Sequence, residues 1–327
     1  MDTVSQNDVS RSEALKSPIN PKLYDLISKT LGGKVLKDYP LSRLTTFRIG
    51  GPADLVVLPS NEKQICAVVK ILRENQIRFM PLGSGSNMLF PDQGYRGALI
   101  CLGQAKHLEI IENNETEIIV KAHAGATLAG VIRKMAHFQA LGVSRLWGIP
   151  GQIGGSIACN AGALGINLSD LICEIELLDE KCKKIVSKNR DLDYGYRTMK
   201  LPAGAIVTSA LLKASKGDAG EIGRELELAR AKRRSSQPRG LASAGCIFRN
   251  PAPENPAGAI IDRLGFKGMR SGSAEISTIH ANFIVNHGKA QARDVMKLIE
   301  AIRRKVWTEE RIDLELEIKI IEDGEEN

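Results

Sequence analysis

The middle of the chain reads Gly148-Ile149-Pro150-Gly151-Gln152-Ile153-Gly154-Gly155-Ser156-Ile157-Ala158-Cys159-Asn160-Ala161-Gly162-Ala163. So many small residues in succession let another molecule, or another segment of the chain, approach the backbone closely. A helix over 156–163 would turn its first N–H groups toward a diphosphate. Tight backbone packing at a domain junction explains the same composition, and this stretch alone does not separate the two interpretations.

A second cluster of small residues, Gly83-Ser84-Gly85-Ser86-Asn87, follows a predicted strand. It begins like the G-x-G-x-x-G turn of dinucleotide-binding βαβ units. However, Met88 replaces the third glycine, and an apolar segment broken by Pro91 follows where a helix should start. Locally, a strand–turn–strand corner is the simpler interpretation. The alternative is a phosphate-binding nest of backbone N–H groups, and two such loops are what a dinucleotide lying between two subdomains needs.

Strand-like and helical patterns alternate around these loops without a regular βαβ repeat, which indicates an α+β fold. The predicted strands are 44–49, 54–58, 78–82, 117–122 and 312–321, the last with alternating apolar and charged residues. The predicted helices are 23–31, 65–74, one capped by Thr127 and ended by Gly142, 221–234 and 292–307.

The domain organisation follows from polarity and glycine content. Residues 1–20 are polar without a sustained apolar period, so residues 1–35 are expected to form a disordered tail and the short helix. The segment 213–220 is small, polar and glycine-containing, as domain boundaries often are. We therefore expect a nucleotide-binding domain at 36–215, with subdomains at about 36–104 and 105–215, and a C-terminal domain at 216–327.

Composition limits the class of protein. Hydrophobic residues make up 43% and charged residues 25%, as in globular proteins, and no apolar run is long enough to span a bilayer. The first residues lack a signal-peptide pattern and the six cysteines lack C-x-x-C spacing, so we expect a cytoplasmic protein with reduced thiols and no metal site. The charge of +7 suits anionic small ligands at least as well as nucleic acid, and aromatic residues at 4% are too few for base stacking.

Further motifs occur in order along residues 36–322. They are Thr45–Ala53, Leu82–Leu89, the stretch from Gly148 to Ala163, Tyr196-Arg197, Ser243–Pro251, Ala257–Asp262, His280–Asn286 and Leu314–Ile318. Together these segments resemble the UDP-N-acetylenolpyruvoylglucosamine reductase (MurB) family.

This resemblance implies an FAD-binding fold of the PCMH/vanillyl-alcohol-oxidase (VAO) type with two subdomains, followed by an α+β substrate domain. It also implies FAD as cofactor, NADPH as co-substrate and a UDP-sugar enolpyruvate as substrate, in a monomer that binds neither nucleic acid nor membrane. The implied cofactor-binding residues are Arg48, Gly50, Gly83, Ser84, Gly85, Ser86, Asn87, Gly148, Ile149, Pro150, Gly151, Gly154, Gly155, Ser156, Asn160, Ala161 and Gly162.

The resemblance implies two charged catalytic residues. Arg197 would fork onto the substrate carboxylate and stabilise an enolate, and Glu317 would polarise the enol intermediate or relay a proton. From local sequence alone, Arg197 is a surface arginine at a strand end, and Glu317 lies on the charged face of a strand that would point to solvent. Tyr196 would shape the pocket, although a core role explains it equally well.

Cys246 occupies the position at which the family commonly has serine as the acid that protonates the substrate. A thiol has an ordinary pKa of about 8.5, so cysteine is a competent proton donor unless nearby arginines stabilise the thiolate. Without the surrounding motif, a buried and inert cysteine is the simpler interpretation. Ser243 is a fallback acid three residues earlier.

Asn250 is the best candidate for UDP-sugar binding, with Lys267, Arg249 and Arg234 as weaker ones that solvated surface roles explain as well. Arg197 and Cys246 are 49 residues apart, a short spacing that resembles the shorter, type II form of the family. Two alternatives remain: an oxidase of the same fold, which would need a different C-terminal domain, and a non-catalytic nucleotide-sugar or nucleic-acid binder.

Overall fold

The computed structural model describes residues 19–322. The predicted disorder of residues 1–18 concerns residues outside this range. Ile19 and Asn20, assigned to the same tail, instead belong to the fold: Ile19 is buried, and the Asn20 side chain accepts a hydrogen bond from Leu23 N at 2.9 Å. This cap, with proline in the first turn, starts helix α2 (Pro21–Thr30) before the predicted position.

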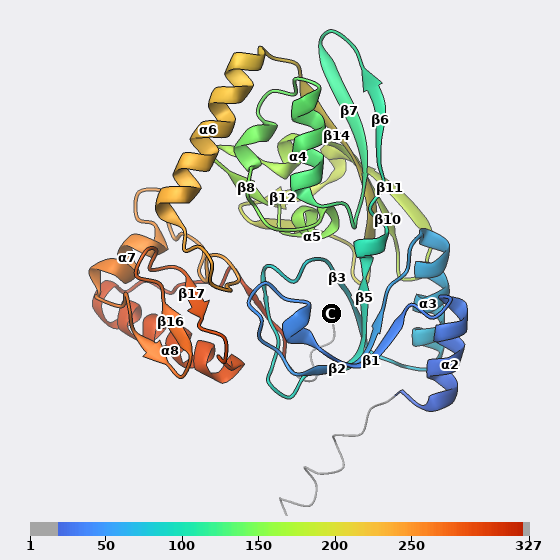
Figure 1. Ribbon diagram of the computed structural model, residues 1–327, viewed down its shortest axis with the longest axis horizontal. Coiled ribbons are helices and arrows are strands. Elements are labelled where there is room, and N and C mark those ends of the chain that lie inside the picture. The colour runs from blue at the N-terminus through green and yellow to red at the C-terminus, as the bar shows by residue number, and fades with distance from the viewer. Residues whose placement is uncertain (1–18, 323–327) are drawn as a thin grey trace, which may run out of the picture.

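The first subdomain is a sheet covered by two helices, α2 and α3 (Glu62–Glu74), on one face (Figure 1). Its strands are, in spatial order, β1 (Val35–Pro40), β2 (Pro52–Val57), β5 (Tyr95–Cys101) and β3 (Phe79–Leu82). β1 is antiparallel to β2, whereas β5 runs parallel to β2 and β3. Leu55 and Val57 pack with the helices and Val56 packs on the opposite side, as the alternation of a strand requires.

Residues 44–49, predicted as a strand, form a loop after the short helix η1 (Leu41–Arg43). Thr46 N donates to Gly85 O at 3.2 Å, and the Thr46 hydroxyl donates to Ser243 O at 2.8 Å. Arg48 adopts a left-handed φ of 55°, and Phe47 is buried in the core of the C-terminal region. The strand prediction was wrong because these apolar residues are buried against a distant segment rather than in a sheet.

The second subdomain is an antiparallel sheet with its helices on one face. Its strands are, in spatial order, β11 (Lys184–Lys188), β10 (Ile172–Leu178), β14 (Ile206–Ser215), β7 (Glu117–His123) and β6 (Leu108–Asn113). Apolar side chains from the sheet share a core with α4 (Leu128–His137), η3 (Val143–Leu146) and α5 (Ile153–Ala158).

Two predicted helix boundaries in this subdomain were wrong. Thr127 does cap α4, accepting a hydrogen bond from Gly130 N at 3.1 Å, but the helix ends at His137 rather than near Gly142, because Gln139 turns left-handed with φ 62°. The helix predicted over 156–163 instead covers 153–158. Asn160, with φ 40°, redirects the chain after it.

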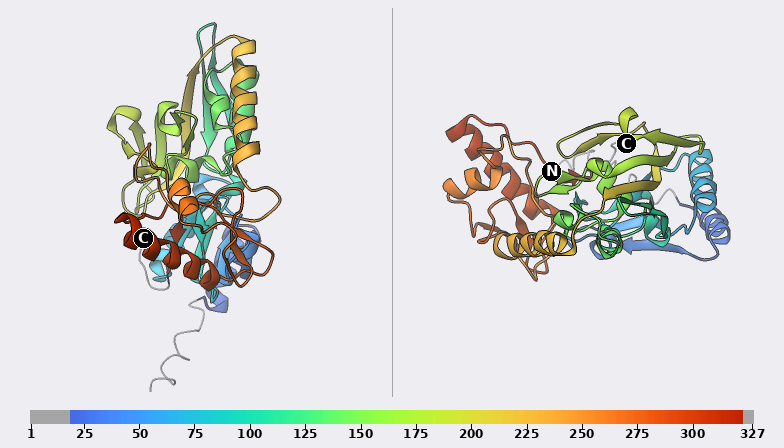
Figure 2. Two further views of the ribbon diagram at one scale, coloured as in Figure 1. Left: turned by 90° about the vertical axis from the view of Figure 1, so that its left-hand side faces the viewer. Right: turned by 90° about the horizontal axis from the view of Figure 1, so that it is seen from above.

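The C-terminal region begins with α6 (Ala219–Ser236), the predicted charged helix. Buried Glu225 accepts hydrogen bonds from Gly142 N and Arg145 Nε, so α6 packs along η3 of the second subdomain. Figures 1 and 2 show the elements after α6 as a separate lobe. They are α7 (Ala257–Arg263), β15 (Arg270–Ser271), β16 (Ala274–Ile276), β17 (Ile284–Asn286) and α8 (Ala292–Glu310).

The last segment joins that lobe to the first subdomain. Leu316 bridges to Phe248, whereas β18 (Lys319–Ile320) pairs parallel with β4 (Met88–Leu89). The prediction of one strand over 312–321 was therefore wrong: the segment is extended but changes partners at Glu317. No helix within residues 19–322 is long and apolar enough to cross a membrane. The remaining short elements are η2 (Leu102–Gln104), β8 (Gly162–Ala163), β9 (Ile166–Asn167), η4 (Leu168–Asp170), η5 (Asn189–Asp191), β12 (Asp193–Gly195) and β13 (Thr198–Lys200).

Asp92 of the first subdomain caps α8 of the C-terminal lobe. Its carboxylate oxygens accept hydrogen bonds from Ala292 N at 2.7 Å and Arg293 N at 3.2 Å. We expect Asp92→Ala to lower the free energy of unfolding by about 1–2 kcal/mol, because it leaves helix N–H groups without their cap. Urea unfolding measures this. The exposed Asp191→Ala should change stability by less than about 0.5 kcal/mol, and equal losses in both variants would contradict a specific cap.

Candidate functional site

A cavity of about 1280 Å³ lies where the two subdomains and the C-terminal lobe meet. The first subdomain contributes the loop Gly83–Met88, and the second contributes Gly148–Gly151 together with Arg197. The C-terminal lobe and the last segment contribute Ser243–Cys246 and Glu317. Segments far apart in sequence therefore line the same cavity.

The loop after β3 is a tight turn that only glycine accommodates at its centre. Gly85 has φ 56°, and a Cβ there would lie 2.4 Å from Leu44 O. At Gly83 an added Cβ would meet only the Gln152 side chain, at 3.7 Å, so this part of the backbone is accessible from the cavity. Ser86 Oγ donates to Pro150 O at 3.2 Å, which joins the two glycine-rich loops directly.

The second loop approaches the cavity with its backbone rather than with a helix end. The N–H groups of Ile153 and Gly154 donate to Ala126 O and Ala124 O, both at 2.9 Å. The helix begins at Ile153 rather than at Ser156, and the neighbouring turn satisfies its first two N–H groups. Ser156 N, the first N–H group of the helix predicted over 156–163, donates to Gln152 O at 2.8 Å within α5. Gly155 has open space where a Cβ would be, and it lines the cavity with Ser156.

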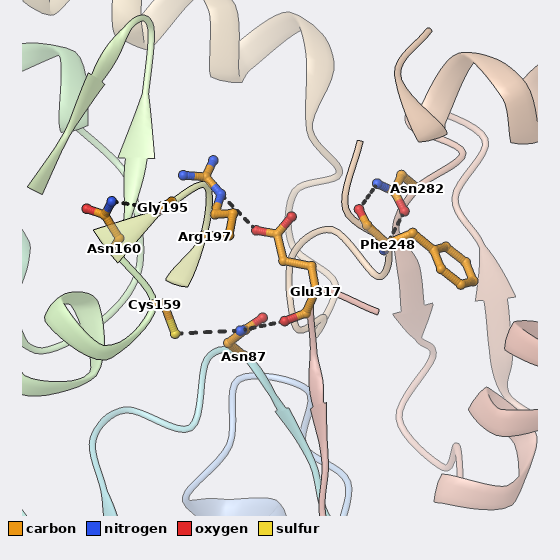
Figure 3. Close-up of polar contacts among 8 residues, drawn as sticks. All are labelled: Asn87, Cys159, Asn160, Gly195, Arg197, Phe248, Asn282 and Glu317. Atoms are coloured by element: carbon orange, nitrogen blue, oxygen red, sulfur yellow. Dashed lines mark hydrogen bonds and ion pairs between the residues drawn. The ribbon is translucent and has the colours of Figure 1, made fainter. Parts of the chain in front are cut away.

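Arg197 and Glu317 form an ion pair in the cavity wall (Figure 3). Arg197 Nε donates to Glu317 Oε1 at 3.1 Å, and both side chains are largely buried. The Asn160 side chain holds the turn before Arg197 by donating to Gly195 O at 3.0 Å, and Arg197 itself is left-handed with φ 56°. The Asn87 side chain donates to the backbone oxygen of Glu317 at 2.9 Å, so the first glycine-rich loop holds the backbone of Glu317.

Burial raises the pKa of the Glu317 carboxyl above its ordinary value, while the Arg197 charge and hydrogen bond oppose the shift. The structure thus gives Glu317 a partly desolvated environment rather than the solvated face expected from strand alternation. The change of partners at this residue is the reason: Glu317 N donates to Ile247 O at 2.8 Å, and the Glu317 side chain lines the cavity together with Cys246.

Cys246 lies in the cavity wall, held by backbone pairing with Phe283. The Asn282 side chain fixes Phe248, two residues further on, by accepting from Phe248 N and donating to Phe248 O (Figure 3). Burial raises the pKa of the Cys246 thiol to about 12; the Glu317 carboxylate adds to the shift, and Arg197 and Arg233 oppose it. The thiol is therefore protonated at neutral pH, despite the nearby arginines.

Several residues named from the sequence lie outside the cavity lining. A Cβ on Gly50 would lie 2.9 Å from those of Leu41 and Phe90, and one on Gly154 would lie 3.0 Å from that of Ala124, so both glycines serve packing. Arg48 is exposed, while Asn160 acts through Gly195 O.

The three residues predicted to bind the substrate, Tyr196, Asn250 and Lys267, do not line the cavity. Tyr196 is exposed and its ring lies 5.4 Å from the Arg197 guanidinium carbon. Asn250 Oδ1 accepts from Ala257 N at 3.1 Å, which supports the start of α7. Lys267 pairs with Asp262 at 2.6 Å in the C-terminal lobe.

Sequence reasoning missed Arg233, Gln152 and Cys159, which all line the cavity. Arg234 was named from the sequence instead of Arg233. The available signal was the helical spacing, because Ile222, Ala229 and Arg233 share one face of α6. Burial lowers the pKa of Arg233. A Cβ on Gly148 would lie 2.7 Å from Arg233 Cδ, so this glycine makes room for the arginine. Cys159 Sγ accepts from the Asn87 amide at 3.7 Å (Figure 3).

The cavity fits a flavin dinucleotide. It is roomy enough for a large cofactor, since small-molecule sites usually measure about 300–1,000 Å³. Gly83 and Gly155 leave backbone accessible where side chains would intrude. Within residues 19–322, Gln152 Oε1 is buried without a hydrogen-bond partner, so an acceptor is available between the two loops.

Comparison with known proteins identifies the family. A model described as "FAD binding domain" matches residues 53–185, and one described as "UDP-N-acetylenolpyruvoylglucosamine reductase, C-terminal domain" matches residues 237–321. The UDP-N-acetylenolpyruvoylglucosamine reductase of Syntrophus aciditrophicus is 37% identical over 310 residues, which cover 93% of this chain and 99% of the relative. That of Bacillus subtilis is 34% identical over 292 residues, covering 88% and 94%.

A solved structure agrees. The crystal structure of UDP-N-acetylenolpyruvylglucosamine reductase from Thermus caldophilus aligns with TM-score 0.75 and 31% identity, over 88% of this chain and 98% of that one. The predicted fold, an FAD-binding PCMH/VAO-type domain followed by an α+β C-terminal domain, is confirmed. An oxidase with a different C-terminal domain is inconsistent with the match at 237–321. The chain therefore belongs to the UDP-N-acetylenolpyruvoylglucosamine reductase family of FAD-dependent oxidoreductases.

Proposed function

We propose that this chain reduces UDP-N-acetylglucosamine enolpyruvate to UDP-N-acetylmuramate with NADPH and bound FAD, as a step of peptidoglycan precursor synthesis. The observation that carries the proposal is the meeting of Arg197, Cys246 and Glu317 on one wall of a cavity whose other walls are the two glycine-rich loops. The protein is expected to act as a monomer in the cytoplasm.

The two loops are proposed to hold the cofactor. Backbone N–H groups of Gly83–Asn87, Gly148 and Gly151 suit its diphosphate, together with the hydroxyls of Ser84 and Ser156. Ser86, Ile149 and Pro150 line the same space. Gly155, Ala161 and Gly162 line the same space and allow close approach. Gly50 packs against Leu41 and Phe90, Gly154 packs against Ala124, and the Asn160 side chain donates to Gly195 O. These residues and Arg48, whose O accepts a hydrogen bond from Asn286, are proposed to act indirectly, by holding the backbone around the site.

FAD held by the two loops would supply, after its reduction by NADPH, the hydride for C3 of the enolpyruvyl group. As the C3–H bond forms, the electron pair of the C2=C3 double bond moves to C2 and the adjacent carboxylate. Arg197 is proposed to stabilise this charge: its Nε already engages Glu317, and the remaining guanidinium N–H groups can fork onto the substrate carboxylate. The ion pair keeps the guanidinium in one orientation before substrate binds.

Cys246 is proposed to protonate C2. Its Sγ–H bond breaks as the C2–H bond forms, which leaves a thiolate that must regain a proton from solvent. The raised pKa keeps the thiol protonated beforehand, and the two arginines lower the cost of the transient thiolate. Glu317 stands beside this path and is proposed to relay that proton or polarise the enol.

Substrate recognition is proposed to use cationic and amide groups of the C-terminal side. Arg233 is a partly desolvated cation in the cavity wall, which suits an anionic group of the substrate. Tyr196, Asn250 and Lys267 are the positions implied by the family resemblance. Of these, Tyr196 lies directly against Arg197.

The half-reactions test this function. Under anaerobic conditions NADPH should bleach the flavin absorbance of the purified protein, and UDP-N-acetylglucosamine enolpyruvate should restore it with formation of UDP-N-acetylmuramate. UDP-N-acetylglucosamine, which lacks the enolpyruvyl group, is the matched control and should leave the flavin reduced. A protein that takes up no FAD, or one whose flavin only oxygen reoxidises, would rule the proposal out.

A further inference from the structure

We propose that Cys66 and Cys182 form a reversible disulfide that links the two subdomains of the flavin-binding domain. Cys66 lies on α3 in the first subdomain, and Cys182 lies in the turn between β10 and β11 in the second. They are 116 residues apart in sequence and do not belong to the cavity lining. The inference is therefore independent of the catalytic assignment.

The two cysteines already contact each other in the reduced state. Each thiol donates to the backbone of the other residue: Cys66 Sγ lies 3.8 Å from Cys182 O, and Cys182 Sγ lies 3.8 Å from Cys66 O. This reciprocal arrangement places the residues side by side across the subdomain boundary. A disulfide needs Cα atoms about 4.4–6.8 Å apart, and the proposal requires this pair to adopt that separation when it is oxidised.

Both cysteines are held in place by surrounding structure. They pack against an apolar cluster that spans the boundary, in which Ile65 and Val68 of α3 meet Leu178 and Ile206 of the second sheet. The turn carrying Cys182 is fixed by Asp179, whose Oδ1 accepts from Lys181 N at 2.8 Å and Lys183 N at 2.7 Å. The surrounding packing and hydrogen bonds therefore keep the two thiols next to each other.

Oxidation requires a thiol-reactive partner, and a small-molecule disulfide such as oxidised glutathione is the chemical class proposed. One protein thiol loses its proton and attacks a sulfur of the reagent, whose S–S bond breaks and releases one thiol. The second protein thiol loses its proton and attacks the mixed disulfide, which releases the other thiol. Two protein thiols are oxidised by two electrons, and the reagent is reduced to two thiols.

The reduced pair is expected to persist until such an oxidant is present. Both residues are partly exposed, so a reagent can reach them. Burial raises the pKa of the Cys66 thiol to about 11, and the adjacent Cys182 and Glu62 add to the shift, so Cys66 is protonated at neutral pH. A protonated thiol reacts slowly, and this favours a response to sustained oxidation rather than to traces of oxidant.

The disulfide would close a loop from residue 66 to residue 182 that contains both glycine-rich segments and α4. Closing a long loop restricts the unfolded chain and fixes α3 against the second sheet. Since the two glycine-rich loops belong to different subdomains, the same link restrains the separation that flavin release requires. Oxidation is therefore expected to raise the melting temperature and to slow flavin loss.

Peptide mapping of the folded, full-length protein tests the proposal. After incubation of the folded protein with oxidised glutathione, the protein is denatured, its free thiols are blocked with iodoacetamide, and it is digested without reductant. Mass spectrometry should find a peptide containing Cys66 linked to one containing Cys182, with two of the six thiols lost to alkylation. The melting temperature should rise by about 5 °C or more and return on adding dithiothreitol.

Single substitutions separate this pair from the other thiols. Cys66→Ser and Cys182→Ser should abolish the linked peptide and the thermal shift, whereas the matched control Cys173→Ser, on neighbouring β10, should retain both. The proposal is overturned if all six thiols of the wild-type protein remain open to alkylation, or if the linked peptides join other cysteines. These wild-type results do not depend on whether a variant folds.

Discussion

Replacing Cys246 by alanine is expected to lower turnover about 10²–10⁴-fold, the usual contribution of a general acid, while NADPH still reduces the flavin at the wild-type rate. The physical reason is that, in the proposed mechanism, Cys246 Sγ donates the proton to C2, and alanine has no proton to donate. Hydride transfer from NADPH occurs before this step and needs no acid. Stopped-flow measurement of the two half-reactions separates the effects.

Two further variants sharpen this prediction. Cys246→Ser should retain substantial activity, because a hydroxyl at the same position can also donate a proton. Cys159→Ala removes the other thiol of the cavity wall, which accepts a hydrogen bond from Asn87, and should cost less than about tenfold. Cys246 is not the acid if Cys246→Ala turns over at the wild-type rate, or if Cys159→Ala lowers turnover as much as Cys246→Ala does.

Replacing Arg197 is the second change with a large expected effect. Arg197→Lys should lower kcat about 10²–10³-fold, the typical loss when one preorganised donor to a developing anion is removed. A lysine keeps the charge, but its single ammonium cannot bond Glu317 and the substrate carboxylate in the fork geometry of a guanidinium. Steady-state kinetics should show the loss in kcat more than in KM, because the enolate charge develops after binding. Exposed Arg190→Lys is the matched control and should leave kcat unchanged.

The pH dependence of Arg197→Met distinguishes a catalytic role from a structural one. Arg197 lowers the pKa of Glu317 against the raising effect of burial, so removing its charge should raise that pKa further. If the carboxylate is the active form, activity is lost as pH falls through this pKa, and the acidic limb of the rate profile moves to higher pH in the variant. Glu317→Gln should lower kcat about 10²-fold or more and remove the limb altogether. An acidic limb that is identical in wild type and Glu317→Gln would show that Glu317 does not carry it.

Local patterns predicted the elements whose stability is local. Thr127 caps α4 as expected, and α3 buries Ile65, Val68, Val69 and Leu72 at helical spacing. These signals were sufficient because a cap or an apolar stripe is contained within one turn or one helix face. Segments whose backbone groups form hydrogen bonds with residues distant in sequence were predicted less well, because those partners cannot be identified from the local pattern.

Residues 44–49 illustrate that limit. Their strand-like composition predicted a strand, but Phe47 is buried in a core supplied by residues near the other end of the chain. The final segment is a second case: its charged face predicted a solvated Glu317, whereas the change from Phe248 to β4 as partner turns that side chain into the cavity. Neither the burial of Phe47 nor the position of Glu317 follows from the local sequence, because both depend on which distant segments pack against these residues.

The amino-acid sequence by itself determined the chemistry available to this protein: two glycine-rich loops with accessible backbone, a guanidinium, a thiol and a carboxylate, in an order that resembles one family. Only the tertiary structure decided which of these groups act on one another. Arg197 and Glu317 are 120 residues apart and meet at 3.1 Å, and the same folding buries the Cys246 thiol and raises its pKa to about 12. The reason is that burial and charge pairing are properties of the space between segments, and that space exists only after the subdomains and the C-terminal lobe have packed together.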